Sequence, residues 1–113
     1  MARDVCQRIA DVLSAIEKAE RFGRLDRSDE VVLAAVLHEL TVVGEAVNAL
    51  LRDDPELQNR QSAVPWRGIV GMRNRLVHEY ERVDPDFVWG VLDTDLSPMR
   101  LAVESERSRR GCS

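Results

Sequence analysis

Arg73 and His78 lie five residues apart in a segment, residues 73–80, that also holds Tyr80, the only tyrosine of the chain. Histidine can take a proton from one group and give one to another, because its pKa lies near neutrality. Arginine can bind a phosphate through two parallel hydrogen bonds and offset charge developing on its oxygens. Attack of a ribose 2′-hydroxyl on its phosphodiester needs both functions. Arg73 and His78 are therefore candidate catalytic residues for RNA cleavage without a metal ion.

The predicted helical geometry of this segment separates the two side chains. At 100° per residue, Arg73 and His78 are about 140° apart, whereas Arg73 and Tyr80 share a face. Arg73 and His78 can both border one pocket only if the helix lies along its wall, or if a second helix brings in partners. A twofold dimer that places the segment against its copy would do the latter, and it would gather two arginines and two histidines around one cleft. Asn74, which shares a face with His78, is a candidate supporting residue.

Each of these residues also has a structural interpretation. Arg75 is a candidate substrate-binding residue, but it can equally form a solvated ion pair with Glu79. We interpret His38, which has no arginine neighbour, as structural. Glu45 interrupts an apolar stretch and can be a partly buried acid that pairs with an arginine of the third predicted helix. Two other functions stay open, namely a non-catalytic subunit that binds a nucleotide or presents a substrate, and a purely structural helical dimer.

Charge is unevenly distributed along the chain. The 113 residues carry a formal net charge of -4, which argues against a general nucleic-acid coat protein. Residues 60–82 nevertheless hold five arginines against two glutamates, so this segment is about +3. A small basic site on an acidic body fits a local phosphate contact better than a long electrostatic track.

The two cysteines, Cys6 and Cys112, have no metal-binding spacing, and we expect neither a metal site nor a disulfide. The first four residues lack the apolar stretch of a signal peptide. Residues 31–51 are the only candidate membrane span, but polar and charged side chains interrupt it, which favours a core helix. The composition therefore predicts a reduced, cytoplasmic protein that does not contact a membrane.

Apolar residues recur at three- and four-residue steps along most of the chain, which predicts an all-α protein. We expect an antiparallel bundle of about five helices in a domain of residues 1–104, followed by a charged, flexible tail at 105–113. The predicted helices lie at residues 3–21, 29–52 and 65–80, then after Asp84-Pro85 and from Ser97-Pro98, with a polar connection at 53–64. Ser28 is the expected N-cap of the second helix. Gly68 and Gly71 predict close approach of another helix to the third.

The residues around Arg73 resemble a known family. Arg73-Asn74-x-x-x-His78-x-Tyr80 matches the Arg-x4-His-x-Tyr form of the HEPN motif. Four further blocks occur in the matching order: Val-Gly-Glu-Ala at 43–46, Val-Pro-Trp-Arg at 64–67, Ile-Val-Gly-Met-Arg at 69–73 and Asp-Phe-Val-Trp at 86–89. Over residues 3–103 the chain resembles HepT-like proteins, the toxins of HEPN/MNT toxin–antitoxin pairs.

This resemblance implies a HEPN-like helical bundle that forms a homodimer with the motif at the dimer cleft. It implies a metal-independent endoribonuclease toxin, without a cofactor, in which Arg73 and His78 are catalytic and Asn74 supports them. It also implies a cognate partner, a minimal nucleotidyltransferase antitoxin. In the family that partner can transfer AMP from ATP to the motif tyrosine, which corresponds to Tyr80.

Overall fold

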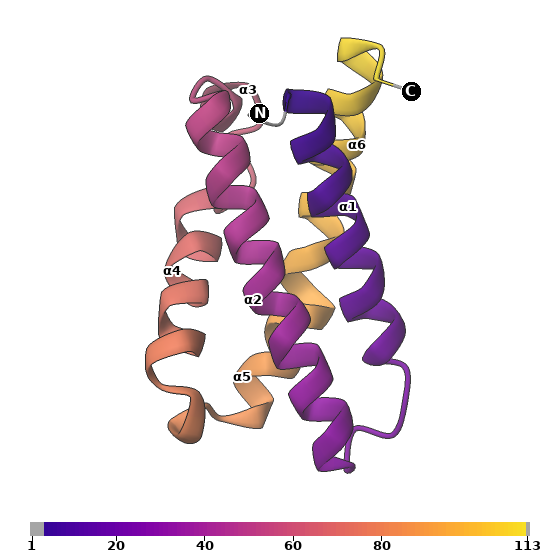
Figure 1. Ribbon diagram of the computed structural model, residues 1–113, viewed down its shortest axis with the longest axis vertical. Coiled ribbons are helices and arrows are strands. Elements are labelled where there is room, and N and C mark those ends of the chain that lie inside the picture. Colours follow the sequence, from indigo (N-terminus) through magenta and orange to yellow (C-terminus); the bar gives the residue numbers. More distant parts are fainter. Residues whose placement is uncertain (1–3, 113) are drawn as a thin grey trace.

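The computed structural model describes residues 4–112, and every regular element among them is helical (Figure 1). The α-helices are α1 (Val5–Phe22), α2 (Glu30–Asp53), α3 (Leu57–Arg60), α4 (Trp66–His78), α5 (Pro85–Gly90) and α6 (Leu96–Arg110). A 3-10 turn occupies Tyr80–Arg82, and a π-helical turn occupies Val91–Asp95. The predicted all-α bundle is confirmed. Helix α3 is an addition within the segment predicted as a polar connection, and residue 3, the predicted start of the first helix, lies outside the described residues.

Helix α2 is the central element of the bundle. It packs against α1 on one side and α4 on the other, while α6 packs against α1 (Figure 1). Its side chains at Val36, Leu40, Val43 and Val47 are fully enclosed. This confirms the prediction that residues 31–51 form a core helix. Among the described residues, no helix is both long and apolar enough to span a membrane.

Short polar side chains set where the first two helices begin. Asp4 accepts a hydrogen bond from the Gln7 backbone N–H at 2.8 Å, and Gln7 accepts one from the Asp4 N–H at 2.9 Å, which forms a capping box. Helix α2 is capped by Asp29, whose carboxylate accepts from the Val31 N–H. The prediction of Ser28 as this cap is wrong, because its hydroxyl instead donates to Asp26.

The chain from Pro85 to Arg110 stays helical through α5, the π turn and α6. The sequence predicted a new helix at Ser97-Pro98, but α6 already begins at Leu96. Pro98 cannot donate a backbone hydrogen bond, and its ring crowds the carbonyl four residues earlier. That carbonyl lies in the π turn Val91–Asp95, whose wider backbone accommodates the proline without ending the helix.

The C-terminal segment is part of the folded helix α6. Residues 105–113 were expected to form a flexible tail, and this is wrong for the part that the structure describes. Helix α6 continues to Arg110 and ends at Gly111, whose φ of 68° is the left-handed conformation that glycine favours. Glu106 is only 2% exposed. Glu106, which was expected to lie in a charged tail, is therefore a buried residue of the folded domain.

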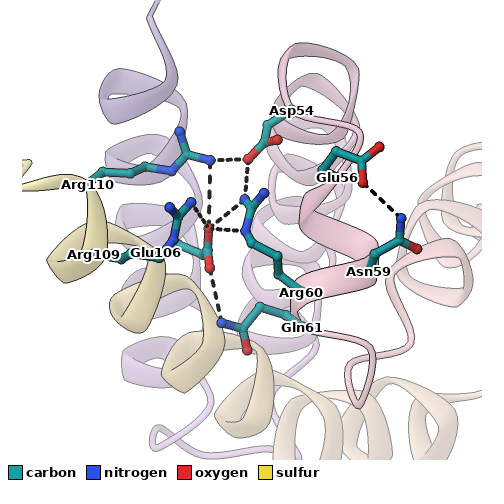
Figure 2. A network of polar contacts seen from close by, with 8 residues as sticks. All are labelled: Asp54, Glu56, Asn59, Arg60, Gln61, Glu106, Arg109 and Arg110. Carbon is teal, nitrogen blue, oxygen red and sulfur yellow. Dashed lines mark hydrogen bonds and ion pairs between the residues drawn. The ribbon is translucent and has the colours of Figure 1, made fainter.

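Glu106 joins α6 to the short helix α3 through a network of polar contacts (Figure 2). Its carboxylate accepts hydrogen bonds from Arg60 at 2.7 Å, from Arg109 at 3.0 Å and from Gln61 at 3.1 Å. The Asp54 carboxylate accepts a hydrogen bond of 2.5 Å from the Arg60 guanidinium and also forms an ion pair with Arg110. The network fixes the end of α6 against the connection that follows α2.

This network makes the fold sensitive to acid. Burial alone would raise the pKa of Glu106, but the hydrogen bonds from Arg60, Arg109 and Gln61 outweigh it and lower the pKa from 4.5 to about 2. The contribution of Glu106 to the free energy of unfolding is therefore fully present above pH 4.5 and is lost as the pH falls towards 2. We expect a loss on the order of 3 kcal/mol over that window.

Measuring the free energy of unfolding by urea at pH 7, 4.5 and 2 tests this prediction. Glu106→Gln should be less stable at pH 7 and should lose less stability between pH 4.5 and 2 than the wild type. An equal loss in both proteins would show that other carboxylates account for the acid sensitivity.

A disulfide joins Cys6 in the first turn of α1 to Cys112, which follows α6. The two Cα atoms are 5.6 Å apart, within the range that a disulfide spans. The prediction that neither cysteine is paired is wrong. The ends of the described chain lie near each other at one end of the bundle (Figure 1), so residues 106 positions apart in the sequence are neighbours in the fold.

Candidate functional site

The candidate catalytic segment lies at the end of α4 and in the turn that follows. Arg73, Asn74, Arg75 and His78 belong to α4, which ends at His78, and Tyr80 begins the 3-10 turn Tyr80–Arg82. The helix was predicted to continue through Tyr80, and this is wrong. Because α5 starts at Pro85, the chain must reverse direction within a few residues. The predicted shared face of Arg73 and Tyr80, which assumed an unbroken helix, therefore does not hold.

Arg73 is held in a defined position between α2 and α4. Its guanidinium donates to Glu45 at 3.0 Å and to the side-chain oxygen of Asn74 at 2.9 Å. The prediction that Glu45 pairs with an arginine of the neighbouring helix is confirmed, although Glu45 is exposed rather than partly buried. The third nitrogen, Nε, is buried without a hydrogen-bond partner among the described residues. About a third of the Arg73 side chain remains exposed, so the guanidinium is oriented but can still reach an anion.

The close approach of α2 to α4 depends on Gly44. A Cβ atom at this position would overlap the Cβ of Arg73 and lie 2.9 Å from its Cγ. The sequence predicted such an approach at Gly68 and Gly71 instead. A Cβ at Gly71 meets no described atom within 4 Å, and one at Gly68 meets only Pro65 of its own segment. The small residue that lets two helices meet is therefore on α2, directly beneath Arg73.

Gly44→Ala tests this contact. The added methyl group meets the base of the Arg73 side chain, which cannot move without α4, and we expect a loss of stability of about 1–3 kcal/mol. Gly90→Ala is the matched control, since a Cβ at that helical position meets no described atom within 4 Å. The control should be neutral or stabilised by up to about 1 kcal/mol. Equal stability of the two variants in urea unfolding would contradict the close approach.

His78 lies on the surface at the C-terminal end of α4. It lines a hollow of about 440 Å³ together with Val77, Tyr80 and Arg82, and with two glutamates of the same turn. Among residues 4–112 its ring has no hydrogen-bond or ion-pair partner. The imidazole is therefore accessible to a ligand. Arg73 does not line this hollow. One chain alone does not bring the two candidate catalytic groups into one site.

Arg75 packs against the turn and helix that follow α4. Its guanidinium lies 4.6 Å from the centre of the Phe87 ring and 3.5 Å from a carboxylate oxygen of Glu79. The predicted ion pair with Glu79 is confirmed. Both partners are largely exposed, so the ion pair contributes only about 0–1 kcal/mol.

His38, which the sequence led us to interpret as structural and not as a site residue, also lies in this region. It is exposed on α2 and lines a second hollow with Thr41, Val77 and Tyr80. The signal that could have found it is spacing, since His38, Thr41 and Glu45 recur at steps of three and four along α2. Glu45 is the residue that pairs with Arg73. The same stripe of α2 therefore faces the candidate catalytic segment.

Comparison with known proteins places the chain in a family. The family model described as ribonuclease HepT-like matches residues 4–106. A Caldanaerobacter subterraneus protein, provisionally named as an RNase, is 33% identical over 76 residues, which cover 67% of this chain and 65% of that protein. A Methanocaldococcus jannaschii protein with the same provisional name is 27% identical over 107 residues, covering 90% of this chain and 95% of that protein.

A relative in Thermococcus cleftensis, named probable ribonuclease HepT, is 29% identical over 104 residues, which cover 88% of this chain and 92% of that protein. No solved structure matches the chain. The family match spans all the α-helices up to α6, including the whole candidate catalytic segment. This chain therefore belongs to the ribonuclease HepT-like family.

Proposed function

We propose that this protein is a metal-independent endoribonuclease that cleaves single-stranded RNA, and that it is the toxin of a HEPN/MNT-type toxin–antitoxin pair. One observation supports this most strongly. The family match includes the complete Arg73–His78–Tyr80 motif, and the structure leaves the His78 ring exposed while orienting Arg73 through Glu45 and Asn74.

The active form is a homodimer in which two copies of α4 meet around one cleft. His78 takes the proton from a ribose 2′-hydroxyl, whose oxygen then attacks the adjacent phosphorus. His78 of the partner subunit gives a proton to the leaving 5′-oxygen as the phosphodiester bond breaks. Arg73 holds the phosphate and offsets the charge on its oxygens. The products are a 2′,3′-cyclic phosphate and a 5′-hydroxyl, and Asn74 supports the reaction by holding Arg73.

Cleavage of a labelled single-stranded RNA in EDTA tests this proposal. We expect fragments that end in 2′,3′-cyclic phosphate. Activity that appears only when a divalent metal is added would contradict the metal-independent mechanism. Absence of cleavage under both conditions, together with nucleotide binding that weakens in Arg73→Ala, would favour a non-catalytic binding subunit, which the net charge of -4 mildly supports.

The partner in this proposal is a nucleotidyltransferase antitoxin that transfers AMP from ATP to the Tyr80 hydroxyl and releases pyrophosphate. Tyr80 is 56% exposed, so its side chain is accessible to such an enzyme. The added phosphate and nucleoside bring negative charge and bulk to the hollow that His78 lines, where an RNA phosphate must lie.

Intact-mass measurement of the protein, produced with and without the nucleotidyltransferase encoded beside it, tests the modification. We expect a mass gain of one adenylyl group or a small number of them. Tyr80→Phe should show no gain, because Tyr80 is the only tyrosine. A gain that persists in Tyr80→Phe would place the modification elsewhere, and tight complex formation without a gain would indicate inhibition by occlusion.

A further inference from the structure

A second hollow lies between α2 and the end of α4, next to the one that His78 lines. Its volume is about 330 Å³, and its lining includes Leu37, His38 and Thr41 of α2, Leu76 and Val77 of α4, and Tyr80 of the 3-10 turn. No lysine, arginine, aspartate or glutamate is among the described residues that line it. The hollow is therefore suited to a neutral group rather than to a phosphate or a cation.

The lining has the chemistry of a site for a flat ring. His38 and Tyr80 supply two planar rings, while Leu37, Leu76 and Val77 supply apolar surface. Thr41 donates its hydroxyl hydrogen to the Leu37 carbonyl at 3.0 Å, so its oxygen is left to accept a hydrogen bond. A nucleobase has two apolar faces that stack on aromatic rings, and its edge carries hydrogen-bonding groups.

The two hollows share a wall. Val77 and Tyr80 line both of them, and Val77 is 46% exposed although it is aliphatic. In a nucleotide chain each base is joined to its phosphate through one ribose. A strand whose phosphate lies beside His78 can therefore place a neighbouring base across Tyr80, in the second hollow.

We propose that the hollow between α2 and α4 is a nucleobase subsite for the RNA strand. The base stacks on His38 and Tyr80, and Thr41 accepts a hydrogen bond from an exocyclic amino group on its edge. This assignment rests on the proposed ribonuclease function, because the strand must also occupy the hollow of His78. His38 contacts the substrate in this account and determines where the strand lies, although it takes no part in proton transfer.

The test uses short single strands of DNA that carry one ribonucleotide, so that each has one scissile bond. In a matched set, each nucleotide flanking that bond is made abasic in turn. For the wild type, loss of the base that occupies the subsite should lower kcat/KM roughly tenfold or more. In His38→Ala, kcat/KM should already be low for the strand with all its bases, and removing that base should lower it little further.

Three further variants separate stacking from folding. His38→Phe keeps an aromatic wall and should restore the dependence on the base. Thr41→Val should reduce the preference for adenine or cytosine over uracil at that position. Thr94→Val, an exposed threonine outside the hollow, is its matched control and should behave as the wild type.

Binding of all-DNA strands, which lack the attacking 2′-hydroxyl, separates this proposal from the ribonuclease function. Suppose that no strand containing a ribonucleotide is cleaved, but that the affinity for all-DNA strands depends on one base in the wild type and not in His38→Ala. The subsite then stands and the catalytic proposal fails. If an abasic position lowers the affinity by the same factor in the wild type and in His38→Ala, the subsite is overturned. It is also overturned if His38→Ala changes only the dimer mass, since a second copy of the chain would then occupy the hollow.

Discussion

His78→Ala is expected to lower the rate of RNA cleavage by about two to four orders of magnitude, as loss of a general acid–base catalyst does. The melting temperature should stay within about 1–2 °C of the wild type, because His78 is exposed and has no hydrogen-bond or ion-pair partner among residues 4–112. Cleavage assays in EDTA and thermal unfolding measure the two effects. Full activity of the folded variant would remove His78 from the mechanism.

Arg73 needs a more careful design, because it also contributes to structure. Its guanidinium joins Glu45 and Asn74, and its Cβ packs against Gly44, so Arg73→Ala changes packing as well as charge. Arg73→Lys keeps the charge but loses the planar fork that binds a phosphate through two hydrogen bonds. We expect it to lose at least tenfold in kcat/KM while staying folded. Arg67→Ala, an exposed arginine earlier on α4, is the control.

Loss of the disulfide is the second large effect. Cys6 and Cys112 are separated by 106 positions, so the bond restricts nearly the whole unfolded chain. The chain-entropy model gives up to about 5 kcal/mol for a loop of this length, and measured values are usually about 2–4 kcal/mol. Cys6→Ser/Cys112→Ser should therefore lower the melting temperature by roughly 10 °C or more.

Thermal unfolding with and without a thiol reductant checks this prediction. The wild type should lose stability when reductant is added, and the double variant should not respond. RNA cleavage at 25 °C should change little, because the disulfide is at the opposite end of the bundle from the end of α4 (Figure 1). Two alkylated thiols in the untreated wild type, with no effect of reductant, would contradict the account.

Periodicity made the core of this fold predictable. The apolar steps along α1 and α2, and the Asp84-Pro85 start of α5, are local signals that the structure confirms. The C-terminal segment carries no such signal. Glu106 is an isolated acid among polar residues, and its burial depends on Arg60 of a helix 46 positions earlier. The pairing of Cys6 with Cys112 likewise follows from where the chain ends meet, which no local pattern encodes.

The candidate site was predictable in composition but not in shape. The spacing of Arg73, His78 and Tyr80 identified the segment, and the charge of Glu45 indicated an ion pair with an arginine of the third predicted helix, which is Arg73. The predicted helix ends at His78 and does not continue to Tyr80, because the chain reverses towards α5 through a 3-10 turn that begins at Tyr80. That turn places Tyr80 in the lining of both hollows, one of which His38 of α2 also lines.

Mixed dimers test most directly whether two copies share one cleft. A wild-type subunit is combined with a subunit carrying both Arg73→Ala and His78→Ala, and the mixed dimer is isolated through two different affinity tags. Because the shared cleft needs arginine and histidine from both copies, the cleavage rate per mixed dimer should be at least tenfold below that of the wild-type dimer. Retention of half the wild-type rate would show that each chain works alone, and would contradict the shared cleft.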